Sequence, residues 1–210
     1  MKVKKGSTVA VIKGKTRSIL TAERTALIFL SFLSGIATQT HQFVEAVKTF
    51  SAKILDTRKT TPTLRSLEKY AVKCGGGENH RFNLEDLILI KDNHIAANQS
   101  LSAIEKIIQR FRRISKVPIE IEIDRLDQLP PVLKTCPNFI LLDNMTTSQM
   151  KNAVQIVRAS KYKTKPLLEA SGGITLKNVY QIAKTGVDRI SIGALTHHHC
   201  GLDVSMEIKK

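Results

Sequence analysis

From about Ala52 onward, short apolar runs alternate with longer stretches in which apolar residues recur at helical spacing. Strands that alternate with helices of about ten residues indicate βαβ units and a parallel sheet. The predicted strands are Lys53–Asp56, Leu87–Lys91, Ile119–Ile123, Phe139–Asp143, Leu167–Ser171 and Arg189–Gly193. The predicted helices are Leu64–Lys73, Ser102–Ile114, Leu126–Leu133, Thr147–Ser160 and Leu176–Thr185.

These units define an α/β protein. With right-handed crossovers, they are most simply closed as a β/α barrel of the TIM type, complete or partly open, over residues 38–210. A doubly wound open sheet is the competing topology. No Pro/Ser-rich linker interrupts the chain, so we place a soft domain boundary near Gly35–Gln39.

Residues 1–37 have a different pattern and are predicted to be a partial N-terminal α+β domain. Thr8–Ile12 and Thr16–Leu20 read as a strand pair around a turn at Gly14, and a helix is expected from Thr21 through Ala26–Leu33. Two strands and one helix cannot bury their own apolar faces. This region therefore packs on the barrel or is the remnant of a larger domain.

Composition narrows the cellular setting. The formal net charge is +15, but the chain has no tryptophan, only 5% aromatic residues and no nucleic-acid-binding motif, so we expect no specific nucleic-acid partner. The longest apolar run, Ala26–Ala37, is shorter than the ~20 residues that span a bilayer, and no secretory signal is visible. Cys74, Cys136 and Cys200 are widely separated, as is typical of a reducing compartment. We expect a cytoplasmic protein without a membrane partner.

Polar residues gather where the predicted strands end. In a parallel barrel these ends converge on the face that carries active sites. One polar residue at one strand end is usually a turn or a cap, but six successive strands with polar groups indicate a site. The segments are Asp56-Thr57-Arg58-Lys59, Lys91-Asp92-Asn93-His94, Glu120 with Glu122, Asp143-Asn144, Glu169-Ala170-Ser171-Gly172-Gly173 and Ser191-Ile192-Gly193-Ala194.

The stretch 56–95 is rich in groups that bind anions. Arginine offers a bidentate fork to carboxylate or phosphate, and lysine offers a point charge. We therefore predict a strongly anionic ligand; the alternative is that the arginines pair with Glu68, Glu78 or Glu85. The positive or potentially positive residues are Arg58, Lys59, His80, Arg81, Lys91 and His94, and they flank Gly75-Gly76-Gly77.

Other strand-end groups allow more than one interpretation. Ser171-Gly172-Gly173 and Gly193-Ala194 resemble phosphate cradles, although a glycine pair after a strand is also a common tight turn. Glu122 and Asp143 could share Mg²⁺ or stabilise positive charge on a sugar ring. Alternatively, Glu122 neutralises Lys91 or Arg81.

The histidines are ambiguous. His80 and His94 are either structural hydrogen-bonding groups or catalytic groups. His197-His198-His199 looks like a metal tract, but successive residues on one loop rarely bind the same ion, so we interpret it as a loop. Cys74 has no identified base beside it and is treated as a plain thiol.

Taken together, several segments identify a family. LTAERTALIFLSFLSGIAT, DTRKTTPTLRSLEKYAVKCGGGENHR, LIKDNHI, LLDNM, EASGGI and GVDRISIGALTH resemble, in order, the quinolinate phosphoribosyltransferases, also called carboxylating nicotinate-nucleotide pyrophosphorylases. The resemblance covers nearly the whole chain. It implies transfer of a phosphoribosyl group from phosphoribosyl pyrophosphate to quinolinate, giving nicotinate mononucleotide, pyrophosphate and CO₂ in NAD biosynthesis.

The resemblance also implies roles for individual residues. A Mg²⁺ ion and no organic cofactor are expected, and so is a homodimer or higher homo-oligomer in which Arg24 reaches the neighbouring subunit's pocket. The implied quinolinate ligands are Arg58, His80, Arg81 and Lys91; Lys59 and Lys91 meet phosphates and are implied to be catalytic. Glu122 and Asp143 are also implied to be catalytic and would lie near the ribose and the metal, and Ser171, Gly172, Gly193 and Ala194 would surround the 5′-phosphate.

The chain departs from the family pattern at several points. The family has a longer N-terminal domain, Ile28 stands where asparagine is usual, and Thr63 stands where glycine is usual. These departures suggest the alternative of a truncated, weakly active relative that binds anions or a partner protein.

Overall fold

The computed structural model describes residues 2–91, 94, 101–197 and 201–208. Its framework is a parallel six-stranded sheet in the order β1-β6-β5-β4-β3-β2. The strands are β1 (Lys53–Leu55), β2 (Ile88–Ile90), β3 (Ile119–Ile123), β4 (Phe139–Asp143), β5 (Leu167–Ser171) and β6 (Arg189–Ser191). The helices are α1 (Thr16–Val47), α2 (Arg65–Cys74), α4 (Leu101–Ile114), the 3₁₀ turn η1 (Leu126–Gln128), α5 (Leu129–Lys134), α6 (Thr147–Ala159), α7 (Val179–Lys184) and α8 (Ala194–His197).

The predicted alternation of strands and helices is confirmed. β3, β4 and β5 have the expected bounds, and the other three strands are one or two residues shorter at their ends. The segment predicted as one helix over Leu126–Leu133 is a 3₁₀ turn followed by α5, which begins just before Pro130 and Pro131. Proline is tolerated in the first helical turn, where its missing N–H has no partner to lose.

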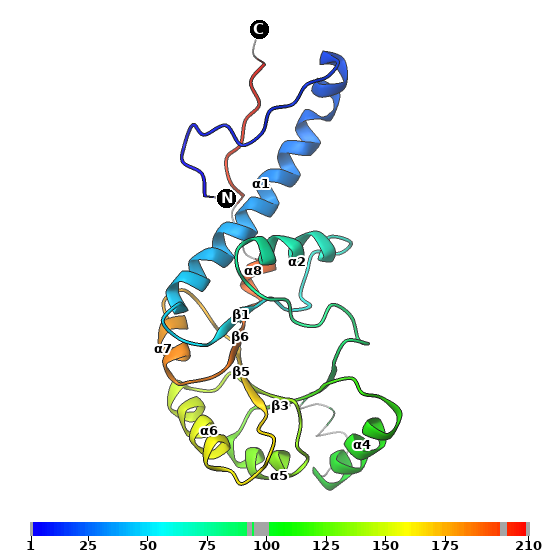
Figure 1. Ribbon diagram of the computed structural model, residues 1–210, viewed down its shortest axis with the longest axis vertical. Coiled ribbons are helices and arrows are strands. Elements are labelled where there is room, and N and C mark those ends of the chain that lie inside the picture. The colour runs from blue at the N-terminus through cyan, green and yellow to red at the C-terminus, as the bar shows by residue number, and fades with distance from the viewer. Residues whose placement is uncertain (1, 92–93, 95–100, 198–200, 209–210) are drawn as a thin grey trace.

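The sheet curves into a barrel that is partly open (Figure 1). β1 and β2 are its two ends, and in the described residues no ladder joins them. The segment before β2 fills part of the gap, because Leu55 forms a parallel bridge with Glu78 and the Asp56 N–H donates to the Glu78 carbonyl at 3.2 Å. The carboxyl ends of all six strands therefore open on one side of the ring.

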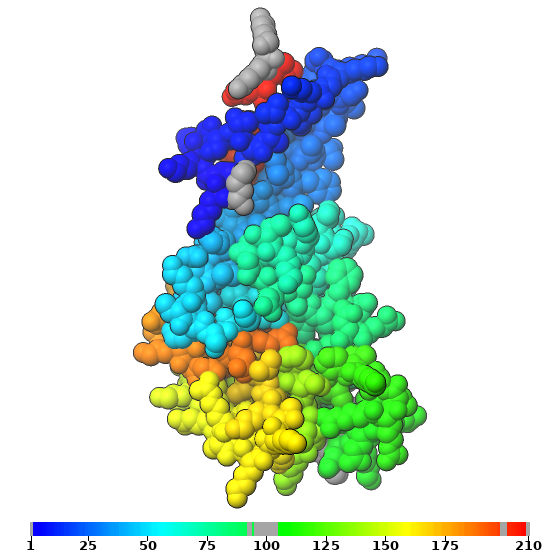
Figure 2. Space-filling view, viewed as in Figure 1, coloured from blue at the N-terminus to red at the C-terminus, as the bar shows by residue number. Residues whose placement is uncertain are grey.

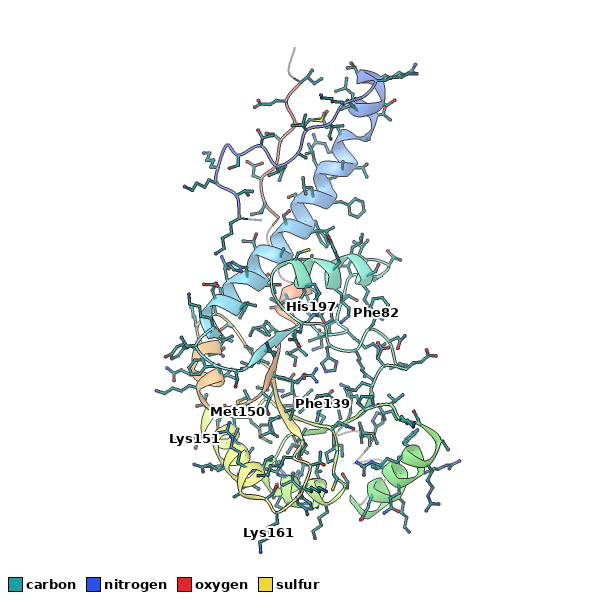
Figure 3. All side chains as sticks on the ribbon, viewed as in Figure 1. Phe82, Phe139, Met150, Lys151, Lys161 and His197 are labelled. Carbon is teal, nitrogen blue, oxygen red and sulfur yellow. The ribbon has the colours of Figure 1, made fainter. Side chains whose placement is uncertain are left out.

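Strict alternation along the strands separates the hydrophobic core from the barrel interior. Ile119, Ile121 and Ile123 of β3 point into the buried cluster under the helices. Glu120 and Glu122 point to the opposite face because successive side chains alternate. Figure 3 shows side chains filling the space inside the curved sheet, Phe139 among them. The barrel thus has an apolar outer layer and a charged interior.

The predicted N-terminal strand pair is wrong, whereas the helix predicted from Thr21 forms as part of α1. No strand pair forms at Thr8–Ile12 and Thr16–Leu20; residues 2–15 have no helix or strand, and the second predicted strand is the first turn of α1. Since α1 runs to Val47 without a break, it also crosses the expected boundary near residue 37. The division into domains stays a prediction.

The C-terminal half of α1 packs on the barrel through close backbone contacts. Gly75 has no room for a side chain, since a Cβ there would lie 2.4 Å from the Ala37 carbonyl oxygen and 2.6 Å from Thr40 Cβ. A Cβ at Gly77 would lie 2.8 Å from Thr40 Cγ2. The glycine tract beside the cations therefore serves helix packing.

The N-terminal half of α1 projects away from the barrel, with residues 2–15 and the C-terminal tail beside it (Figures 1 and 2). The tail is tied to α1 because the Leu202 N–H donates to the Ser31 carbonyl at 3.1 Å. Ile28, Phe29 and Leu30 are exposed. With 32 residues, α1 is long and apolar enough to cross a membrane by length and composition, unlike the shorter run considered above, and 11% of its most apolar window is buried. A single such helix is only a weak indication of a membrane span.

Candidate anion-binding site at the strand ends

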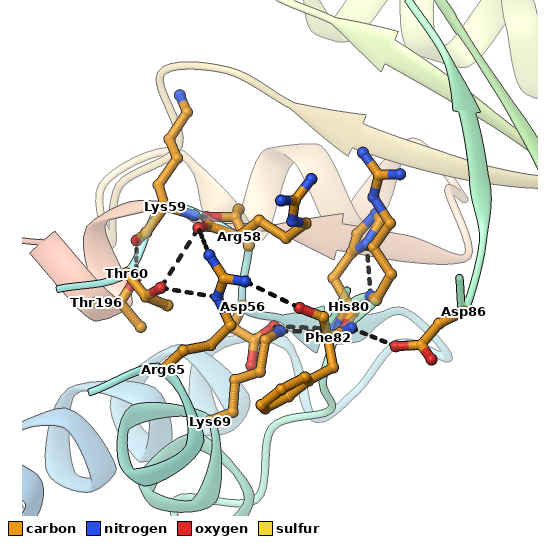
Figure 4. Close-up of polar contacts among 12 residues, drawn as sticks. Asp56, Arg58, Lys59, Thr60, Arg65, Lys69, His80, Phe82, Asp86 and Thr196 are labelled. Atoms are coloured by element: carbon orange, nitrogen blue, oxygen red, sulfur yellow. Dashed lines mark hydrogen bonds and ion pairs between the residues drawn. The ribbon is translucent and has the colours of Figure 1, made fainter. Parts of the chain in front are cut away.

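Hydrogen bonds hold the main chain of the loop after β1 at Arg58 and Lys59 (Figure 4). The Lys59 N–H donates to Thr57 Oγ1 at 3.1 Å, and Thr196 of α8 donates its hydroxyl to the Lys59 carbonyl at 2.6 Å. Arg65 Nη2 donates to the Arg58 carbonyl at 3.4 Å. These bonds hold the main chain and leave both cationic side chains for a ligand.

Arg58 and Arg81 lie near each other without an acidic partner. Arg58 Nε is buried and has no hydrogen-bond acceptor. Arg81 Nη1 donates to the Leu87 carbonyl at 3.0 Å. Burial, and next the charge of Arg58, lower the pKa of Arg81. Two like charges held together in a partly buried place favour an anionic ligand between them.

The alternative surface ion pairs do not form. Throughout the described chain, no carboxylate lies within ion-pair distance of Arg58 or Arg81. Glu68 instead accepts the Thr61 N–H at 3.2 Å, and Glu78 lies 3.9 Å from Lys53. The arginines are therefore available to a ligand.

Lys91 and Glu122 form a loose pair at the ends of β2 and β3. Lys91 Nζ lies 3.7 Å from Glu122 Oε2, and the lysine side chain is half exposed. The interpretation that Glu122 neutralises Lys91 is thus confirmed, although a pair this open can admit a ligand. Asp143 ends β4 on the interior face, where its Oδ2 accepts the Asn144 amide at 2.9 Å.

Glu122 and Asp143 fit a magnesium site by their chemistry. Mg²⁺ is usually held by one or two carboxylates together with substrate phosphates and water. Both carboxylates lie on the barrel-interior face of adjacent strands, beside the cationic groups that would meet phosphates.

The glycines at the ends of β5 and β6 serve close approach. Gly172 has φ +94°, and a Cβ there would lie 2.1 Å from Asn144 Oδ1. Only glycine fits, so the turn after Ser171 lies directly against the end of β4. A Cβ at Gly193 would lie 3.2 Å from His197 Nε2 and 3.8 Å from Lys59 Cδ. The lysine stem therefore lies beside the start of α8.

The backbone N–H, the carbonyl and Nδ1 of His80 have hydrogen-bond partners, while Nε2 faces two carboxylates at ion-pair distance. Its N–H donates to Asp56 Oδ1 and its carbonyl accepts from Lys69 Nζ, both at 2.9 Å. The Arg81 N–H donates to His80 Nδ1 at 2.8 Å. His80 Nε2 lies 3.1 Å from Glu120 Oε2 and 3.3 Å from Glu169 Oε1.

A buried charged cluster lies below this histidine. Glu120 and Glu169 are both completely buried, and Arg189 Nε lies 3.0 Å from Glu169 Oε2 while its guanidinium stacks 4.3 Å from the Phe139 ring centroid. Burial opposes protonation of His80, but Glu120 and Glu169 outweigh it and raise its pKa to about 9. Burial, and then the charge of Glu169, raise the pKa of Glu120.

His80 and Glu120 are coupled, so their protons belong to the pair and not to either residue alone. The cluster contains two carboxylates, the positive charge of Arg189 and His80. It is neutral when it holds one extra proton, which the same groups in isolation would have lost. The Arg81 N–H needs a lone pair on His80 Nδ1, so the geometry favours the Nε2–H tautomer with the extra proton on the carboxylate pair. Either placement gives the same total charge.

The main chain of His80 rests on a second buried pair. Lys69 and Asp56 are almost fully buried, and Lys69 Nζ donates to Asp56 Oδ1. Burial raises the pKa of Asp56 and lowers that of Lys69, while their mutual hydrogen bond opposes both shifts. Removing either partner would leave a buried charge without compensation.

The structure thus brings most of the predicted site residues to one end of the barrel. Arg24 is not among them, because it lies on the exposed part of α1, 11 residues or about 16 Å along the axis before the first buried position, Gly35. Asp92 and Asn93 lie outside the described residues, and so do His198 and His199 of the segment interpreted as a loop. Its first residue, His197, ends α8. The gathered residues are Arg58, Lys59, His80, Arg81, Lys91, Glu122, Asp143, Ser171, Gly172, Gly193 and Ala194.

Sequence reasoning missed the groups under the site. Lys69 and Arg189 were given no role, and Glu169 was noted only as a strand-end residue. The alternating IEIEI run does place Glu120 on the barrel-interior face with Glu122, which is one usable signal. A shallow hollow of about 400 Å³ on α4 does not belong to this site, since its lining residues are all on that helix: Lys106, Gln109, Arg110, Arg113 and Ile114.

A β/α barrel with two arginines, two lysines and two carboxylates at its strand ends defines an enzyme-like site for a polyanionic substrate. The model of the quinolinate phosphoribosyl transferase C-terminal domain matches residues 36–207. The chain belongs to the quinolinate phosphoribosyltransferase family.

Individual relatives agree with this assignment. The nicotinate-nucleotide pyrophosphorylase [carboxylating] of Mycobacterium leprae is 43% identical over 208 residues, covering 99% of this chain and 72% of the relative. A probable one from Synechocystis is 44% identical over 204 residues, covering 95% and 67%. The solved structure of NadC from Streptococcus pyogenes has a TM-score of 0.84 and 41% identity, covering 92% of this chain and 66% of that chain. The chain thus spans about two thirds of the length of these relatives.

Proposed function

We propose that this protein is a carboxylating nicotinate-nucleotide pyrophosphorylase of NAD biosynthesis. It would transfer a phosphoribosyl group from phosphoribosyl pyrophosphate to the ring nitrogen of quinolinate and release pyrophosphate and CO₂. The observation that carries the proposal is the pair Arg58 and Arg81, side by side without a carboxylate partner in the described residues. A pyridine dicarboxylate supplies the missing negative charge.

The proposed chemistry assigns the remaining groups by charge. Lys59 and Lys91 meet the phosphates, and Ser171, Gly172, Gly193 and Ala194 line the 5′-phosphate. Glu122 and Asp143 face the ribose, where a carboxylate stabilises the positive charge that develops as pyrophosphate leaves. Clamped carboxylates place the ring nitrogen against the anomeric carbon, so much of the rate gain comes from positioning.

Mg²⁺ is proposed as the metal, held by Glu122, Asp143 and the substrate pyrophosphate, and it would neutralise charge on the leaving group. No organic cofactor is needed for decarboxylation, because the alkylated pyridinium ring is itself the electron sink.

We further propose a homodimer or higher homo-oligomer. Arg24 lies on the exposed N-terminal half of α1, which projects away from the barrel, so we assign it to the pocket of a neighbouring subunit. The exposed apolar residues of α1 around it (Leu20, Ile28 and Phe29) are suited to burial in such an interface.

Product analysis of the purified protein with quinolinate, phosphoribosyl pyrophosphate and Mg²⁺ tests the function. We expect nicotinate mononucleotide and CO₂ in equal amounts. Arg58→Ala should lower kcat/KM for quinolinate by about 10²–10³-fold, since it removes one partner of a charge pair worth about 3–4 kcal/mol. Arg125→Ala, at an exposed arginine paired only with Asp127, is the matched control and should leave the rate within about twofold.

Folded wild-type protein that neither binds quinolinate nor forms nicotinate mononucleotide at saturating substrate would overturn the proposal.

A further inference from the structure

His80 is the best anchored residue of the pocket, and both nitrogens of its ring are already occupied. Nδ1 accepts the Arg81 N–H at 2.8 Å, so it carries a lone pair. Nε2 then carries the proton and faces two buried carboxylates at 3.1 and 3.3 Å. An imidazole with both nitrogens committed inside the protein has no free polar atom for a substrate carboxylate.

The residue that His80 supports is Arg81. The bond to Nδ1 fixes the Arg81 main chain, and the bond from Arg81 Nη1 to the Leu87 carbonyl fixes its side chain. Arg81 then stays beside Arg58 in spite of their mutual repulsion. Without the histidine, this repulsion would move the flexible guanidinium toward solvent.

We propose that Glu120 and Glu169 are positioning residues of the anion pocket: they hold the His80 imidazole in the orientation that anchors Arg81, and so set the spacing of the Arg58–Arg81 clamp. This inference rests on the proposed function, because it concerns how that site recognises the dicarboxylate. It assigns His80 to the support of the clamp, instead of to direct contact with quinolinate.

The same three residues have ligand atoms within 4.8 Å of one another and could hold a metal ion by distance alone. Two features argue against that use. A nitrogen that carries a proton cannot bind a metal, and His80 Nε2 is protonated when Nδ1 accepts a hydrogen bond. Glu169 Oε2 is also occupied by Arg189 at 3.0 Å, and the guanidinium supplies the positive charge that an ion would bring.

Glu169→Gln tests the proposal with minimal change of shape. Glu169 presents one oxygen to His80 and the other to Arg189, whereas glutamine has a single oxygen and must turn its NH₂ toward one of these two donors. The ring should then leave its orientation. We expect the Kd and KM for quinolinate to rise about tenfold, while the KM for phosphoribosyl pyrophosphate stays within twofold.

Nitrogen-15 NMR of the histidine ring supplies a second readout that needs no variant. The wild-type spectrum should show an unprotonated Nδ1 and a protonated Nε2 for His80, and Glu169→Gln or Glu120→Gln should mix the two tautomers. Glu78→Gln, an exposed change two residues from His80, is the matched control and should alter neither the spectrum nor the Kd. Should Glu169→Gln fail to fold, the wild-type spectrum still decides.

Each contrary result has a defined meaning. A wild-type His80 with a protonated Nδ1, or stoichiometric Zn²⁺ binding that Glu169→Gln abolishes, overturns the proposal. So does a loss in Glu169→Gln that falls equally on both substrates. The tautomer and the quinolinate Kd are measured without the co-substrate, so failure of phosphoribosyl transfer would refute the proposed function and leave this test intact.

Discussion

Below the strand-end pocket, charged side chains are buried against one another, whereas on the N-terminal half of α1 apolar side chains are exposed to solvent. Around His80, groups from β1, α2, β3, β5 and β6 meet in a buried network. On α1, Ile28 is 58% exposed and Phe29 is 39% exposed, and both face solvent in the single chain.

A single chain thus supplies the partners of the buried charged groups but does not cover the apolar face of α1. The charged groups around His80 face one another within the barrel, so their chemistry follows from a single chain. The apolar face of α1 would be buried only by another molecule, such as the second subunit proposed above. Substitutions in the two regions should therefore act on different properties, stability in the barrel and assembly on α1.

Lys69→Met should have the largest effect on stability. It leaves Asp56 buried without its counter-charge and removes a donor to the His80 carbonyl, so we expect the free energy of unfolding to fall by about 3–5 kcal/mol. Urea denaturation followed by circular dichroism measures it. Lys73→Met, one turn later on the exposed side of α2, should change stability by less than about 0.5 kcal/mol. A loss below about 1 kcal/mol for Lys69→Met would show that the pocket is not held by this pair.

The pH dependence of stability probes the charged cluster. Burial opposes protonation of His80, but Glu120 and Glu169 raise the pKa at which the His80 cluster loses its extra proton from the ordinary histidine value of 6.5 to about 9. A raised pKa stabilises the fold fully below about pH 6.5, and the stabilisation is lost as the pH rises through about 9. The loss should reach at most about 3 kcal/mol. Denaturation at several pH values measures it, and His80→Gln should flatten the slope. A wild-type curve that is flat from pH 6.5 to 9.5 would contradict the coupling.

Replacement of Ile28 and Phe29 by serine should act on assembly instead. If these side chains are buried between subunits, their loss should weaken association by about 2 kcal/mol, or about thirtyfold, while the barrel keeps its stability. Sedimentation equilibrium measures the dissociation constant. Glu45→Gln, an exposed change elsewhere on α1, should leave it unaltered. A wild-type protein that is monomeric at high concentration would remove the assumed interface.

Thr63→Gly should give the smallest effect, and a gain. Thr63 has φ 69°, a left-handed conformation that strains a β-branched residue. Relief of this strain, less the entropy cost of glycine, should raise the free energy of unfolding by about 1 kcal/mol. Thermal denaturation measures it. Thr61→Gly, in the same loop without positive φ, should instead destabilise the protein.

The barrel was predictable because its information is local. IEIEI shows its alternating period within five residues, FILLD is a short apolar run, and the bounds predicted for both strands are confirmed. The strand pair failed for the opposite reason. Residues 8–20 have strand-like apolar positions, but an isolated pair of strands is unstable without further strands, and Thr16–Leu20 joins the long helix that follows it.

In the candidate site, too, some features were predictable from local sequence and others were not. Arg58, Lys91 and Asp143 were placed correctly because the carboxyl ends of parallel strands converge whatever the details of packing. The environment of His80 was not predicted, because its partners come from positions 24 residues before it and 40 and 89 residues after it. Only the register of the sheet decides which of these side chains meet.

By itself, the sequence determined the alternation of strands and helices, the gathering of charge at the strand ends and the family, since each is written in short runs and motifs. The tertiary structure alone decided that Arg58 and Arg81 lack acidic partners, that His80 is enclosed by Asp56, Lys69, Glu120 and Glu169, and that α1 leaves an apolar face uncovered. Each of these features depends on which distant segments come into contact. In water, a charged group can exchange one partner for another at little cost, but a buried group depends on the partner that the fold places beside it.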